Sequence, residues 1–178
     1  MKGANLNLKR AVVEGDNYGP SDEWTDKVEC VPLALAALIV MFVEDEHNGP
    51  EKLQEHIDWR MKDCVESSDE FGKGSHQMWI AAEEQILQLY NWWIKDRPRL
   101  VKREAELLHA WSEAKHGKEM LEPGELDFAQ DLERRLNAPD TPRSRELFEA
   151  HTDIKERIRA EMQEFCHGVI EVRDFLWT

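Results

Sequence analysis

Residues 90–99, Tyr-Asn-Trp-Trp-Ile-Lys-Asp-Arg-Pro-Arg, are the most informative stretch of the chain for its fold. The two tryptophans end an apolar repeat of helical period, and neighbouring helical positions point about 100° apart. One indole ring can therefore enter the core, while the other must reach a second helix, a ligand or a partner. Pro98 has no N–H and disfavours helical geometry at Arg97, so the helix is predicted to end here.

Apolar residues recur at helical spacing on both sides of this stretch. The pattern predicts helices over residues 32–45, 51–63, 75–94, 101–115 and 125–136, and a last helix that starts near residue 144, or restarts at 153, and continues almost to the C-terminus. A turn is expected at Asn48-Gly49-Pro50, and His116-Gly117 is expected to cap the helix over 101–115. Pro32 is expected at the first position of its helix, and Ser75 is expected to be an N-cap after a loop over 65–74. No segment alternates in the manner of a strand.

These elements predict an all-α fold, an irregular helical bundle of four main helices plus short helices. Residues 1–30 are polar and rich in turn-forming residues, which indicates an irregular N-terminal arm. The remainder, residues 31–178, is long enough for a single helical domain with its own core. The longest apolar run, residues 31–43, falls short of the roughly 20 residues that span a membrane.

The net charge of −14, from 37 acidic and 23 basic residues, argues against a nucleic-acid backbone as the partner. It is compatible with simple solubility, with a basic protein partner, or with mimicry of nucleic acid. The three cysteines, Cys30, Cys64 and Cys166, form no CxxC pair and are typical of reduced thiols in a cytoplasmic protein. We see no secretory signal and no sequence motif that requires a cofactor.

Four short motifs occur in a recognisable order. They are Phe-Val-Glu-Asp-Glu at 42–46, His-Ile-Asp-Trp at 56–59, Leu-Tyr-Asn-Trp-Trp at 89–93 followed by Arg-Pro at 97–98, and Phe-Leu-Trp-Thr at 175–178. Together they resemble a family of uncharacterised proteins encoded by tailed bacteriophages. The resemblance implies a protein of the host cytoplasm or of the virion, and it brings no activity and no site residues.

Two Glu-x-x-His motifs, Glu106–His109 and Glu164–His167, are the sharpest metal candidates. Positions i and i+3 share a helix face, and two such pairs with Glu44 and either Glu83 or Glu84 would resemble a di-iron carboxylate site. The abundance of glutamate makes such motifs common by chance, and their order along the chain differs from the ferritin-like pattern. We therefore expect no metal site.

Two weaker enzyme hypotheses can be weighed in the same way. Glu83-Glu84 could begin a magnesium site of the kind found in all-α nucleotide pyrophosphatases, but the next helical turn lacks the companion carboxylate. Cys166 and His167 are neighbours on a helix and diverge, so the imidazole is not placed to activate the thiol. We expect Cys166 to be a small core residue.

The aromatic and basic residues of the opening stretch form the preferred binding site, consisting of Trp92, Lys95, Arg97 and Arg99. A stacking ring beside cations suits a planar anionic ligand or a protein partner. The structural alternative is that Trp93 packs inside, Trp92 covers a neighbouring helix and Arg97 pairs with a carboxylate. The C-terminal residues 175–178 are expected to dock either onto the bundle or onto another subunit.

These features favour a non-enzymatic phage accessory protein that binds a host or phage macromolecule through a Trp/Arg-rich surface. It would act as an inhibitor, an adaptor or a defence-countering factor, with a protein as its partner. The first alternative is a metal-dependent or nucleotide-binding helical bundle. The second is a virion structural or assembly component, for which a homo-oligomer with Trp177 buried between subunits is expected.

Overall fold

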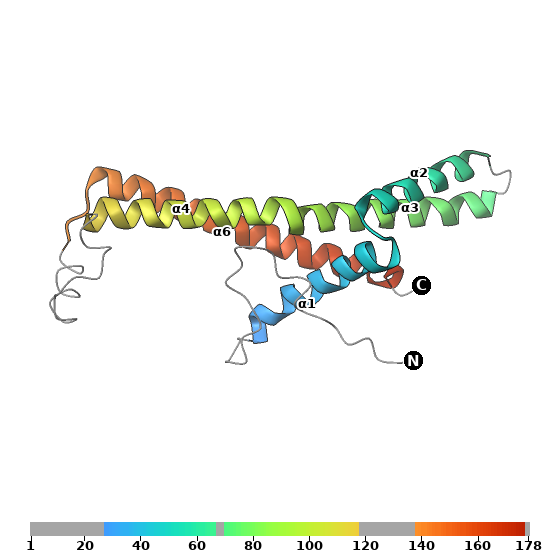
Figure 1. Cartoon of the computed structure of the whole chain (residues 1–178), viewed down its shortest axis with the longest axis horizontal. Coiled ribbons are helices and arrows are strands. Elements are labelled where there is room, and N and C mark those ends of the chain that lie inside the picture. The colour runs from blue at the N-terminus through green and yellow to red at the C-terminus, as the bar shows by residue number, and fades with distance from the viewer. Residues whose placement is uncertain (1–26, 67–69, 118–137, 177–178) are drawn as a thin grey trace. The chain divides into compact units, whose positions relative to one another are not determined.

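Helices make up nearly all of the computed structural model, which describes residues 27–66, 70–117 and 138–176 (Figure 1). They are α1 (Lys27–Met41), η2 (Phe42–Glu46), α2 (Pro50–Glu66), α3 (Glu70–Asn91), η3 (Trp92–Asp96), α4 (Arg97–His116), α6 (Pro142–Val172) and η5 (Arg173–Phe175). No strand occurs in the described ranges, and the all-α prediction is confirmed. None of the helices in those ranges has the length and apolarity needed to cross a bilayer.

The described residues divide into two compact units, where the sequence predicted one domain. The first unit contains the described residues up to Pro98 together with those from Glu161 onward, and the second contains Arg99–Ala160. Of the predicted arm, residues 27–30 belong to α1. Residues 1–26, the helix predicted over 125–136 and Trp177 lie outside the described residues.

The core of the first unit forms around α1, whose side chains Ala36, Ala37 and Ile39 are fully buried. A helix that is apolar on most of its faces must be covered by neighbours, and α2, α3 and the C-terminal part of α6 contribute to this core. In Figure 1, α2 lies alongside α3, and their packing places Leu53 and Ile57 of α2 in the same core. Spacing predicts Leu53, Ile57 and Met61 along one side of α2, but Met61 is exposed.

One polar contact connects α3 to the end of the first helical segment. The Tyr90 hydroxyl donates a hydrogen bond to Oε1 of Glu44 in η2. Burial raises the pKa of Tyr90, and the hydrogen bond to Glu44 raises it further because both favour the neutral phenol. The turn after η2 follows the predicted Asn-Gly-Pro pattern, with positive φ angles at Asn48 and Gly49.

The second unit pairs α4 with the first part of α6. Trp111 lies against Phe148 with 5.6 Å between ring centroids, and Leu107 and Leu147 are buried. Gly117, with a φ of +79°, ends α4 as predicted, and its N–H donates to the carbonyl of Glu113 at 2.8 Å.

A reciprocal cap begins α6 close to the predicted start. The Ser144 N–H donates to Thr141 Oγ1 at 3.0 Å, and the Thr141 N–H donates to Ser144 Oγ at 2.9 Å. These two bonds satisfy backbone donors that have no partner within the helix, which is why the helix can begin here.

Three predicted helix boundaries are wrong, and at the first two tertiary packing outweighs a local preference. Pro32 lies inside α1 and not at its start, in a segment whose burial offsets the missing hydrogen bond. Of the predicted loop over 65–74, residues 65 and 66 belong to α2 and residues 70–74 to α3, so Ser75 is inside a helix. Glycine in a helix costs only about 0.5–1 kcal/mol, which packing on α2 can offset.

The third wrong boundary is Pro98, where the chain remains helical. Residues 92–96 form a π turn, in which the N–H of Arg97 donates to the carbonyl of Trp92, five residues earlier. The wider turn comes immediately before Pro98, and the proline falls in the first turn of α4, where a missing N–H is tolerated. A π turn also changes the direction in which the following side chains point, and such turns often occur at functional sites.

Candidate functional site

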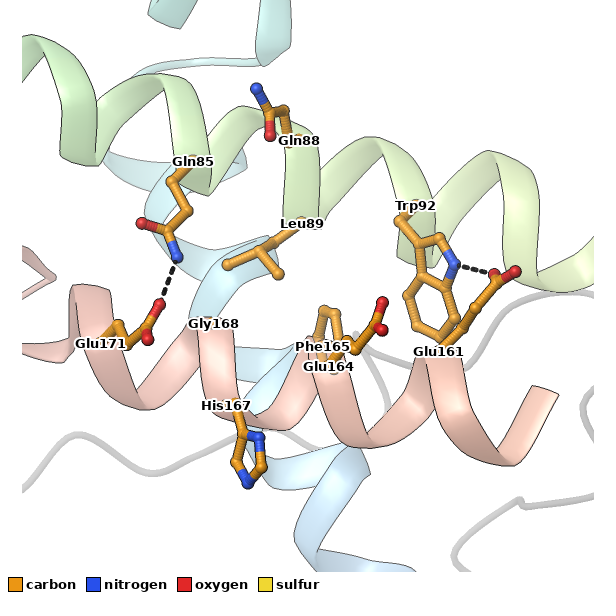
Figure 2. Close-up of a pocket in the computed structure, with 10 residues that line it drawn as sticks. All are labelled: Gln85, Gln88, Leu89, Trp92, Glu161, Glu164, Phe165, His167, Gly168 and Glu171. Carbon is orange, nitrogen blue, oxygen red and sulfur yellow. Dashed lines mark hydrogen bonds between the residues drawn. The ribbon is translucent and has the colours of Figure 1, made fainter. Parts of the chain in front are cut away.

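An open groove of about 530 Å³ runs between α3 and the C-terminal part of α6 (Figure 2). Its lining side chains from α3 and η3 are Gln85, Gln88, Leu89 and Trp92. Those from α6 are Glu161, Glu164, Phe165, His167, Gly168 and Glu171. All of these residues belong to the first unit, and the volume is within the range of ligand-binding clefts.

Gly168 allows the two helices to approach closely in the middle of the groove. A Cβ atom at this position would lie 2.9 Å from Cδ2 of Leu89, closer than real Cβ contacts. Toward one end, Gln85 Nε2 donates to Glu171 at 3.0 Å. Toward the other, Trp92 Nε1 donates to Glu161 at 2.7 Å. Figure 2 shows these two hydrogen bonds on either side of Leu89 and Gly168.

The indole ring of Trp92 is held in a defined orientation at the edge of the groove. It stacks on Phe165 with 5.2 Å between centroids and an interplanar angle of 29°, and it remains half-buried. Its N–H is fixed by the hydrogen bond to Glu161. A partly exposed ring that is already fixed loses little conformational entropy on binding, which makes it a good anchor for a ligand.

Trp93 takes the other role that the sequence predicted for the tryptophan pair. It is 1% exposed and lies 5.1 Å from Phe165, centroid to centroid. The guanidinium carbon of Arg97 lies 4.3 Å from the centre of the Trp93 ring. One ring of the pair is in the core and the other reaches α6.

The predicted Trp/Arg surface does not form as a single patch. Arg97 is 3% exposed, because the π turn places it over the buried Trp93, and it therefore cannot present its charge at the surface. Lys95 and Arg99 are exposed, but neither lines the groove. Of the four predicted binding residues, only Trp92 is part of the groove, and its charged neighbours there are acidic.

The two Glu-x-x-His motifs lie in different units of the described chain. Glu106 and His109 belong to the second unit, whereas Glu164 and His167 belong to the first. His109 is 67% exposed, and Glu106 contacts Arg103 at 3.3 Å. The described residues contain no group of three or more His, Cys, Asp or Glu side chains arranged to hold a metal ion.

The thiol of Cys166 has the character expected of a packed residue. It is half-buried against the core, and burial raises its pKa, which lowers the fraction of reactive thiolate.

A second cavity, of about 760 Å³, contains chemistry that the sequence analysis missed. Its lining side chains are Phe42, Glu46, His47, His56, Arg60, Trp79, Glu83 and Leu176. His47 follows η2, His56 and Arg60 are one turn apart on α2, and Glu83 is on α3. The spacing of four between His56 and Arg60 was visible in the sequence, but only the packing of α2 on α3 brings them to Glu83.

A test of this environment is the protonation of His47. Burial lowers the pKa of its imidazole below the usual value near 6.5, and His56 lowers it further, while Glu83 and Glu46 partly oppose the shift. At pH values between the lowered pKa of His47 in the folded protein and its value near 6.5 in the unfolded chain, the unfolded chain binds more protons. The contribution of His47 to the free energy of unfolding is therefore complete above pH 6.5 and is lost as the pH falls below it. We expect His47→Gln to reduce the loss of stability between pH 7.5 and pH 5.5, measured by urea unfolding.

The matched control is His109→Gln, because His109 is 67% exposed. This variant should show the same pH dependence as the wild type. An NMR titration that gives His47 a pKa at or above 6.5 in the folded protein would contradict the prediction.

Comparison of the chain with protein-family models, with curated proteins and with solved structures finds no match in any of the three. The function is therefore argued from the geometry and chemistry of the two cavities.

Proposed function

We propose that the chain is a non-enzymatic binding protein that holds a basic segment of a partner protein in the groove between α3 and α6. In keeping with the resemblance to tailed-phage proteins, it would be a phage accessory protein of the host cytoplasm, acting as an inhibitor, adaptor or defence-countering factor. The observation that carries this proposal is the fixed indole of Trp92 in a groove whose charged side chains are carboxylates.

The charge of the groove supports a basic ligand. Glu161, Glu164 and Glu171 line it, and none of its described lining residues is a lysine or arginine. Glu164 is exposed, and no ion pair of the described residues involves it. The whole chain carries a net charge of −14, which would also speed the approach of a basic partner.

The aromatic ring of Trp92 at the edge of the groove supports an arginine or lysine side chain in particular. A cation placed over an indole face gains about 0.5–2 kcal/mol, depending on how far it is desolvated. Beside Trp92, such a cation would also lie close to Glu161 and Glu164, both of which can accept its hydrogen bonds. In the Trp/Arg-rich surface expected from the sequence, the cations belong to this chain. In the groove proposed here, they belong to the partner.

The C-terminal end is less suited to be the binding surface. Phe175 packs edge-on against Trp79 of its own chain, with 4.9 Å between ring centroids, and Leu176 packs against the same core. These two residues are thus occupied within the first unit, and the groove remains the better site for a partner.

The proposal is tested by titrating the full chain with an arginine-rich peptide of about twelve residues in a calorimeter. We expect saturable binding that weakens as salt is raised, because the contacting charges are solvent-accessible. Trp92→Ala and Glu164→Gln should each weaken binding, Trp92→Ala by about tenfold, which corresponds to roughly 1.4 kcal/mol and is within the range of a cation–π contact.

Two controls separate a specific groove from general attraction to an acidic protein. Trp59→Ala removes a tryptophan that is 57% exposed on α2, and Glu149→Gln removes an exposed carboxylate from the second unit. Both should bind the peptide as the wild type does. Equal affinity of the wild type and Trp92→Ala would refute the proposal.

A further inference from the structure

Glu83 is a buried carboxylate that lines the second cavity. Its side chain comes from the middle of α3 and is 1% exposed. Carboxylates are rarely buried to this extent unless their charge and hydrogen-bonding capacity are satisfied by neighbours. The partners of its two oxygens therefore indicate what the cavity is suited to bind.

The two carboxylate oxygens have different surroundings. Oε1 accepts a hydrogen bond from Arg60 Nε at 3.1 Å and lies 3.2 Å from His56 Nδ1. Oε2 is buried and has no hydrogen-bond partner among the described residues. Arg60 compensates the charge of Glu83, so the unmet requirement is for a hydrogen-bond donor at Oε2.

Aromatic rings line the same cavity. Phe42 lies 4.7 Å from His47, and His47 lies 5.3 Å from His56, centroid to centroid. Trp79 also lines the cavity, with the guanidinium of Arg60 located 5.2 Å from its ring centre. Ring faces favour a flat, unsaturated ligand that can stack on them.

The charges that face the cavity do not favour a strongly anionic ligand. Arg60 and Glu83 offset one another, and Glu46 adds a further carboxylate. His47 is held toward its neutral form by burial, which lowers its pKa. A neutral, planar ligand with an N–H donor fits these groups better than a phosphate does.

We propose that this cavity binds an amino-substituted nitrogen heterocycle, the ring class of adenosine and cytidine, with Glu83 Oε2 accepting a hydrogen bond from the exocyclic amine. Glu and Asp side chains accept from the exocyclic amine of cytosine in base recognition, and the amine of adenine is a donor of the same kind. This site is separate from the α3–α6 groove and depends on different residues. It adds a small-molecule ligand to the protein partner proposed above.

The test compares nucleosides that differ in the exocyclic group facing Glu83 and in the proton on the adjacent ring nitrogen. Adenosine and cytidine carry an amine where inosine and uridine carry a carbonyl, and a carbonyl oxygen would oppose the buried carboxylate. We expect calorimetry on the full chain to show saturable binding of an amino nucleoside and at least about tenfold weaker binding of its carbonyl counterpart. Equal binding of both members of each pair, or no binding up to about 10 mM, would overturn the proposal.

The Glu83→Gln variant tests whether Glu83 is the residue that distinguishes the amino nucleosides from the carbonyl nucleosides. Glu83→Gln keeps the shape of the side chain but supplies an amide N–H, so it should lose adenosine binding and improve inosine binding relative to adenosine. Glu84→Gln alters the exposed neighbour on the same helix and should leave both affinities unchanged. A shift in preference is not expected from a purely structural role of Glu83, and circular dichroism would confirm that both variants fold.

Two further measurements distinguish this cavity from the α3–α6 groove and from a metal site. Trp92→Ala should bind adenosine as the wild type does, whatever its effect on the arginine-rich peptide. The proposal would be overturned if the wild type bound no nucleoside but bound zinc tightly, and if His47→Ala lost the affinity for zinc. That result would identify the cavity as a metal site.

Discussion

Trp93→Ala is expected to lower the free energy of unfolding by about 3–5 kcal/mol, the usual cost of removing a large aromatic side chain from a core. Trp93 is 1% exposed, lies against Phe165 and carries the guanidinium of Arg97 over its ring. Its removal leaves a cavity and deprives the buried Arg97 of its aromatic contact. For a chain of this size the loss corresponds to a decrease in Tm of roughly 6–20 °C, measurable by circular dichroism.

Trp59→Ala provides the matched control for this prediction. Trp59 is 57% exposed, so its replacement should change stability by no more than about 0.5 kcal/mol. If the two variants unfold at the same urea concentration, Trp93 is not the core residue that the structure describes. Trp93→Phe should lie between them, because a smaller ring keeps part of the contact with Phe165.

Gly168→Leu is expected to destabilise the protein by about 1–3 kcal/mol through overpacking. Even the Cβ of an alanine would lie 2.9 Å from Leu89 Cδ2, and a leucine extends further into the contact between α3 and α6. Gly168→Ala should be nearly neutral, since the gain in helix propensity of about 0.5–1 kcal/mol is offset by the displacement of Leu89. Urea unfolding of the two variants measures both effects.

Gly74→Ala isolates the propensity effect from the packing effect. Gly74 lies inside α3, is exposed, and would have no atom within 4 Å of an added Cβ. This variant should therefore be stabilised by about 0.5–1 kcal/mol. A Gly168→Ala variant that gains as much as Gly74→Ala would show that α3 and α6 do not approach closely at Gly168.

The Gly168→Leu substitution also tests the proposed function. Gly168 lines the groove together with Leu89, and a leucine at position 168 would fill space between Trp92 and the opposite end. We expect Gly168→Leu to reduce binding of the arginine-rich peptide, and Gly74→Ala to leave it unchanged.

Apolar periodicity was sufficient to identify the helices, because a soluble helix must turn one face toward a core. Spacing predicts a stripe of Trp79, Ala82, Ile86, Leu89 or Tyr90, and Trp93. Ala82, Ile86, Tyr90 and Trp93 are buried as expected, whereas Trp79 is only partly buried. The predicted cap at Gly117 and one of the two predicted starts of the last helix, near Ser144, agree with the structure, because both ends depend on bonds within a few residues. Interactions confined to one helical turn can be predicted from the sequence, because the residues that make them are neighbours along the chain.

The predicted helix boundaries were wrong where a local conformational preference competed with the packing of the helix. Pro98 and the glycines before Ser75 are unfavourable in helices, yet the π turn and the contact of α3 with α2 accommodate them. Each preference is worth about one to three kcal/mol, and the packing of a whole helix can exceed it.

Sequence patterns predict the all-α class, most helices, and a tryptophan pair in which one ring enters the core and the other reaches a second helix, a ligand or a partner. They do so because these features depend on periodicity and on the angle between neighbouring positions. Packing between helices, by contrast, buries Arg97 over Trp93, gives Trp92 its acidic neighbours, and brings His47, His56 and Arg60 to Glu83. These juxtapositions join residues from different helices, and their rotation and approach are set by packing that no local pattern encodes.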